Sequence, residues 1–128
     1  MKIAVAIVRI LLGLMFFVFG LNGFFNFFHA PLPGGVAGAF LGAMFQSHYL
    51  ILVAATQVVA GALLLVGQYV PFALALLAPV LANILTYHLT MDHKGLGMAI
   101  VVILLWALVA WRYRASFASL WVRKPSVL

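Results

Sequence analysis

The stretch ILLGLMFFVFGLNGFFNFF, residues 10–28, decides the fold of this chain. It contains no charged side chain, and no Asp, Glu, Lys or Arg follows it until Asp92. A water-soluble domain needs charge on its surface, whereas a transmembrane helix needs about 20 apolar residues in a row. The whole chain of 128 residues is 68% hydrophobic and only 6% charged. The sequence therefore predicts one domain, an all-α integral membrane protein.

Four apolar segments are long enough to cross a bilayer. Between the first and the second, the prolines and glycines of residues 29–35 end a helix. The apolar run from Gly35 to Phe45 is too short to span, so we expect a short interfacial or re-entrant helix there, in the first outer loop. The predicted fold is a four-helix membrane bundle with one short interfacial helix, and its spans are residues 3–28, 49–67, 72–90 and 96–113.

Positive charge gathers near the two ends of the chain, and the formal net charge is +6. The basic residues at these ends are Lys2, Arg9, Arg112, Arg114, Arg123 and Lys124. The opposite side has only Lys94, which Asp92 offsets. The positive-inside rule predicts that both termini are cytoplasmic, in a multi-pass protein of a bacterial-type inner membrane. Because the charges lie at span ends, the expected partner is the lipid bilayer and not nucleic acid.

The chain has no cysteine, which excludes disulfides, thiol catalysis and thiolate metal ligation. A redox role would therefore need a bound cofactor or a redox protein partner. No two of the four histidines are spaced i, i+4 on one helix, so we predict no metal site. Haem ligation by His29 and His88 on neighbouring helices is disfavoured, although all four histidines belong to the outer end. The oligomeric state is left open.

A few polar side chains interrupt the apolar spans, and each needs a protein partner or an aqueous cavity. Asn83 and Tyr87 share a stripe of the third span with Pro79, whereas His88 lies about 140° away from Asn83 around the helix. The favoured interpretation is hydrogen bonding between helices, and the alternative is a polar-lined pocket near the outer surface. The candidate pocket residues are Asn22, Asn26, Gln57, Asn83, Tyr87 and His88.

Arg9 is the one charged residue set clearly inside a span. The favoured interpretation is that its side chain extends to the nearby cytoplasmic surface, and the alternative is that it anchors an anionic or carbonyl-bearing ligand. Arg9 is predicted near the inner surface and Asp92 near the outer one, so the two cannot pair within one monomer. Arg9 must then use lipid phosphate, backbone carbonyls or a partner chain.

Several short segments resemble those of the DoxX-like membrane proteins, and together they cover nearly the whole chain. They are VRILLGL at residues 8–14, FGLNG at 19–23, PLPG at 31–34, QVVAG at 57–61, PVLANI at 79–84 and WRYR at 111–114. The positions that match the family are Arg9, Gly13, Gly20, Gln57, Gly61, Pro79 and Asn83. This resemblance implies a four-helix integral membrane bundle. The family's namesake is similar to a subunit of a thiosulfate–quinone oxidoreductase, and other relatives are linked to oxidative-stress complexes.

Three functions are compatible with these features. The first is an accessory or anchor subunit of a membrane redox assembly, linked to a quinone, and the resemblance favours it. The second is a stand-alone quinone-linked oxidoreductase, which would need a hydrogen-bond donor for the quinone carbonyl. The third is a small-molecule transporter, disfavoured because the spans lack charged pathway residues and internal repeats. A quinone is the cofactor that these spans would accommodate, although no residue pattern demands one.

Overall fold

A computed structural model describes residues 2–26, 31–124 and 126 of the chain. The described residues form helices and no strand, which confirms the all-α prediction. The elements are α1 (Lys2–Phe25), α2 (Gly35–Gln46), α3 (Leu50–Val66), α4 (Val70–Thr90), the 3-10 turn η1 (His93–Gly95), α5 (Leu96–Arg112) and the 3-10 helix η2 (Arg114–Trp121). The short helix predicted in the first loop is α2. Residues 27 and 28, the predicted end of the first span, lie outside the described residues.

Three of these helices are long and apolar enough to cross a membrane on their own: α1, α4, and η1 with α5. α3 has 17 residues, and at 1.5 Å per residue it reaches only about 26 Å, against a hydrocarbon core of about 30 Å. It makes a fourth span only together with α2, from which it is bent by 82°. The predicted second span, residues 49–67, is thus the short one of the four.

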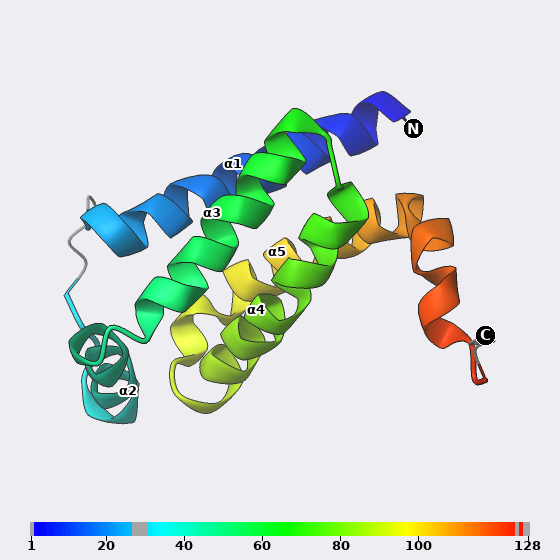
Figure 1. Ribbon diagram of the computed structural model, residues 1–128. Helices are drawn as coiled ribbons and strands as arrows, with labels where there is room; N and C mark the ends of the chain where they lie inside the picture. Colours follow the sequence, from blue (N-terminus) through cyan, green and yellow to red (C-terminus); the bar gives the residue numbers. More distant parts are fainter. Residues whose placement is uncertain (1, 27–30, 125, 127–128) are drawn as a thin grey trace.

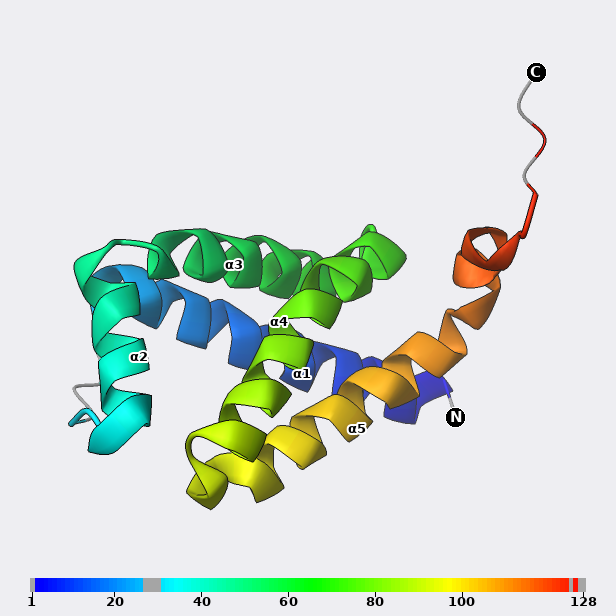
Figure 2. The same cartoon turned by 90° about the horizontal axis from the view of Figure 1, so that it is seen from below.

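The helices pack as a closed ring. α1 packs on α3, α3 on α4, α4 on α5, and α5 on α1, and the two views in Figures 1 and 2 show α1 beside α3 and α4 beside α5. The start of α1 and the end of α5 lie at the same end of the ring, as four crossings require. α2 lies outside the ring at the opposite end.

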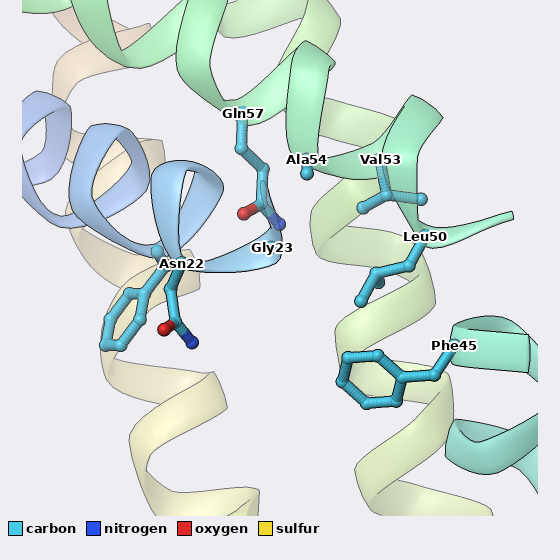
Figure 3. Close-up of a pocket in the computed structure, with 8 residues that line it drawn as sticks. Asn22, Gly23, Phe45, Leu50, Val53, Ala54 and Gln57 are labelled. Carbon is cyan, nitrogen blue, oxygen red and sulfur yellow. The ribbon is translucent and has the colours of Figure 1, made fainter. Parts of the chain in front are cut away.

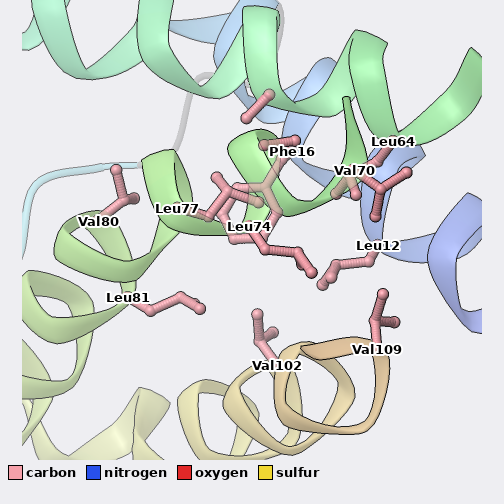
Figure 4. Close-up of a cluster of buried hydrophobic side chains, with 12 residues drawn as sticks. Leu12, Phe16, Leu64, Val70, Leu74, Leu77, Val80, Leu81, Val102 and Val109 are labelled. Carbon is pink, nitrogen blue, oxygen red and sulfur yellow. The ribbon is translucent and has the colours of Figure 1, made fainter. Parts of the chain in front are cut away.

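Side chains from all four ring helices meet in one apolar core (Figure 4). Leu12 of α1, Leu64 of α3, Leu74 of α4 and Val109 of α5 are each 0% exposed. Burial of such side chains excludes lipid and water from the centre of the bundle, so the ring is held by van der Waals packing.

α1 and α3 approach each other closely because glycines face each other across their contact. A Cβ on Gly61 would lie 2.5 Å from the Phe17 nitrogen and 2.8 Å from the Gly13 carbonyl oxygen. One side-chain repeat further along, a Cβ on Gly20 would lie 2.9 Å from the Ala54 carbonyl oxygen. Gly13 thus faces Gly61, and Gly20 faces Ala54. The two positions are seven residues apart along each helix, in opposite chain directions, so the antiparallel helices meet in register on small residues.

The outer surface of the ring is apolar. Ile3, Leu11, Met98 and Leu104 are all more than half exposed, and many other large apolar side chains point outward as well. A soluble monomer rarely exposes apolar surface on this scale, whereas a lipid-facing helix must. The arrangement is that of a multi-pass membrane protein.

Candidate functional site

A groove of about 550 Å³ lies between α2, α3 and α4. Its walls are mostly apolar, with polar side chains from α3 and α4 among them. The lining residues are Phe40, Leu41 and Met44 of α2, Tyr49 before α3, Leu50, Leu52, Val53, Thr56 and Gln57 of α3, and Leu76, Pro79, Val80, Asn83, Ile84, Tyr87 and His88 of α4. This volume is within the range of small-molecule and cofactor sites, about 300–1,000 Å³.

α2 forms the third wall of the groove because the chain turns sharply before α3. His48 in this turn has a positive φ of 63°, and the turn sets α2 at 82° to α3. The Phe40 ring of α2 then lies 5.9 Å from the Tyr87 ring of α4, centroid to centroid. Tyr49 and Leu52 at the edge of the groove are 63% and 68% exposed, so this edge opens toward the lipid-facing surface.

Two polar groups in the groove have no hydrogen-bond partner within the described part of the chain: the Gln57 amide and the Tyr87 hydroxyl. Asn83 is partly engaged, because its amide nitrogen donates to the Pro79 carbonyl at 2.8 Å. Its amide oxygen and second N–H have no partner among those residues. In an apolar membrane interior such groups favour any ligand that offers acceptors and donors of its own.

His88 contributes an imidazole whose orientation is fixed on two sides. Its Nδ1 lies 2.8 Å from the Ile84 carbonyl oxygen, and because a carbonyl only accepts, Nδ1 carries the proton. The ring edge packs against Tyr87, with centroids 4.9 Å apart and planes at 88°. A Cβ on Gly95 would lie 2.3 Å from His88 Nε2, so Nε2 faces the backbone at the start of α5. In its neutral form the imidazole therefore has no N–H left to donate in the groove, and its acceptor nitrogen is directed toward Gly95.

The six candidate pocket residues do not form one site. Gln57, Asn83, Tyr87 and His88 line the groove. Asn22 lines a separate cavity of about 100 Å³ between α1, α3 and the end of α2, where Figure 3 shows its amide and that of Gln57 on facing helices. Asn26 is exposed at the end of α1 with φ 53° and lines neither cavity. Gln57 is the one candidate residue common to both cavities.

The polar stripe of α4 hydrogen-bonds along its own helix. Asn83 donates to Pro79, Thr86 to Ala82 and Thr90 to Thr86, each to a carbonyl four residues earlier. The favoured interpretation of bonds between helices does not describe these three side chains. His88 and Asn83 line the same groove although they lie far apart around α4, because the groove covers a broad face of that helix.

Arg9 takes one of the three partners expected for it, a backbone carbonyl. Its guanidinium donates to the carbonyl of Leu64 near the end of α3. That carbonyl lacks its helical donor, because the backbone N–H of Gln68 bonds instead to Leu63 at 3.2 Å. A cation at a helix C-terminus is also favoured by the helix dipole. Contact of Arg9 with lipid stays a prediction.

The contributions of α2 and of Trp106 could not be predicted from the polar residues of the spans. Phe40, Leu41 and Met44 belong to the short helix expected in the first loop, for which no role in a pocket was predicted. The i, i+4 spacing of Phe40 and Met44 places both on one apolar face of that helix. The indole nitrogen of Trp106 donates to the Leu74 carbonyl at 3.0 Å, and this bond joins α5 to α4. His29, one of the two candidate haem ligands, lies outside the described residues.

A comparison with protein families matches the DoxX model to residues 4–89. This match runs from α1 almost to the end of α4 and includes every residue that lines the groove. No curated protein and no solved structure matches the chain. Because the family model covers more than half of the sequence, and the structure has the apolar helices of a membrane protein, the chain belongs to the DoxX family.

Proposed function

We propose that this DoxX protein is an accessory subunit of a membrane redox assembly and that it holds a quinone in the groove between α2, α3 and α4. The observation that carries the proposal is the groove itself, an apolar cavity of about 550 Å³ in which the Gln57 amide and the Tyr87 hydroxyl have no hydrogen-bond partner among the described residues. A quinone is a neutral, apolar ring with two carbonyl acceptors, and it reaches its sites through the bilayer. The exposed edge at Tyr49 and Leu52 offers that route.

The available groups support binding more than independent catalysis. The Gln57 N–H groups and the Tyr87 hydroxyl can each donate to a quinone carbonyl. The one carboxylate in the chain, Asp92, does not line the groove, and its side chain accepts from the Lys94 backbone at 3.2 Å. In this proposal the partner protein supplies the electrons, and the DoxX subunit holds the quinone ring in the groove between α2, α3 and α4.

The proposal is tested by purifying the protein from its native membranes in mild detergent. Quinone per protein is measured in the lipid extract, and co-purifying proteins are identified. The double variant Gln57→Leu with Tyr87→Phe removes both donors, each worth about 1 kcal/mol. Together the two donors amount to about 2 kcal/mol, so we expect the variant to retain about thirtyfold less quinone than the parent, since about 1.4 kcal/mol is a factor of ten.

The matched control is Gln68→Leu with Tyr69→Phe, which makes the same chemical changes in the exposed turn between α3 and α4. It should retain quinone as the parent does. Recovery of the parent as a lone protein without quinone would contradict the proposal. Quinone reduction by the purified protein alone would instead favour a stand-alone oxidoreductase.

A further inference from the structure

η2 and the residues after it form an apolar surface that the bundle does not cover. η2 turns away from the end of α5 and lies at the end of the ring where α1 begins (Figures 1 and 2). Leu120 is 71% exposed and Trp121 is 83% exposed. Phe117, in contrast, packs against the hydrophobic core and ties η2 to the ring. The segment is therefore fixed in place with its apolar side chains uncovered.

Basic side chains flank this surface on both sides. Arg112 precedes η2, Arg114 is its first residue, Arg123 and Lys124 follow it, and all four are exposed. Arg114 is held in place, because its guanidinium lies 4.5 Å from the centroid of the preceding tryptophan ring and donates to that residue's carbonyl at 2.8 Å. No acidic residue follows Asp92 in the sequence. The positive charge at this end is thus not neutralised by carboxylates nearby in the chain.

We propose that residues 112–124 dock on anionic phospholipid headgroups at the membrane surface, with Leu120 and Trp121 inserted between the headgroups. Tryptophan prefers the membrane interface, and Lys/Arg clusters next to a transmembrane helix attract anionic lipid. α5 already brings the segment to the bilayer surface. A second copy of this chain fits the surface less well, because it would bring the same positive charges.

Spin labelling of the full-length protein tests this docking surface. The parent has no cysteine, so a nitroxide on Leu120→Cys reports on this one position. The protein is reconstituted in nanodiscs of phosphatidylcholine alone, or of equal parts phosphatidylcholine and phosphatidylglycerol. Collisions with a water-soluble nickel chelate should be about threefold rarer in the anionic discs, and high salt should restore them, because salt screens the attraction.

Charge variants separate lipid binding from simple hydrophobic insertion. Arg123→Gln with Lys124→Gln should make the label as accessible in anionic discs as it is in neutral ones. Lys2→Gln with Lys94→Gln removes the same charge elsewhere and should leave the label protected. Equal accessibility in the two lipids, or no effect of the first variant, would overturn the proposal. So would spin–spin broadening that disappears on dilution with unlabelled protein, because a second copy would then cover the surface.

Discussion

The substitution Gly61→Ala tests the packing of α1 against α3 most sharply. A Cβ at this position would lie 2.5 Å from the Phe17 nitrogen and 2.8 Å from the Gly13 carbonyl oxygen. Both contacts are with backbone, so no side chain can rotate away. Optimal contacts lie at about 3.5–4.0 Å, and the two helices must therefore part by about 1 Å.

The cost of that displacement can be estimated from packing energies. A gap of this size removes between about a quarter and a half of the dispersion energy of each contact that it widens. Overpacking of this kind lowers the free energy of unfolding by about 1–3 kcal/mol. The higher helix propensity of alanine offsets about 0.5–1 kcal/mol of this loss. We expect Gly61→Ala to lower the free energy of unfolding by about 1–2 kcal/mol.

The measurement is unfolding by dodecyl sulfate in mixed micelles, followed by the fluorescence of the tryptophans. The matched control is Gly97→Ala in α5, where no atom lies within 4 Å of the added Cβ. It should be neutral or stabilising by about 0.5–1 kcal/mol. Gly13→Ala combined with Gly61→Ala should cost less than the sum, since both open the same contact. A Gly61→Ala protein as stable as the parent would refute the close approach of α1 and α3.

Two further substitutions test bonds that join elements of the ring. Arg9→Gln replaces the charged donor to the Leu64 carbonyl by a neutral one, so the free energy of unfolding should fall by about 1–2 kcal/mol, and Arg9→Lys should recover part of that loss. Equal stability of the parent and both variants would contradict this role of Arg9. Trp106→Phe keeps the ring but loses the bond to the Leu74 carbonyl, and should cost about 0.6–1.7 kcal/mol in the same assay; an unchanged transition would show that this bond adds nothing.

The membrane class and the helices could be predicted because they depend on local composition. The absence of charge from residue 10 to residue 91 required lipid as the solvent, and proline and glycine placed α2 between the first two spans. The prediction could not show that α3 is bent away from α2, because that angle depends on the positive φ of His48 and on the packing of Phe40 against Tyr87.

The candidate site was harder to predict than the fold. Polar residues are rare in these spans, and four of the six candidates line one groove: Gln57, Asn83, Tyr87 and His88. That these residues bind a ligand stays a prediction. Asn22 and Asn26 do not line this groove, which could not be predicted because the sequence does not tell which side of α3 a residue faces. A backbone carbonyl was among the partners expected for Arg9, but the sequence could not identify it as that of Leu64. The unsatisfied carbonyl at the end of α3 comes within reach of Arg9 only when α1 and α3 pack together.

Photolabelling with an azidoquinone tests whether the groove between α2, α3 and α4 binds a quinone. The protein is labelled in lipid nanodiscs, and the modified residues are mapped by mass spectrometry. We expect saturable labelling, displaced by unmodified quinone, on the groove walls at residues 40–57 and 76–88. Labelling spread over the outward-facing side chains of α1 and α5, with no saturation and no displacement, would contradict it.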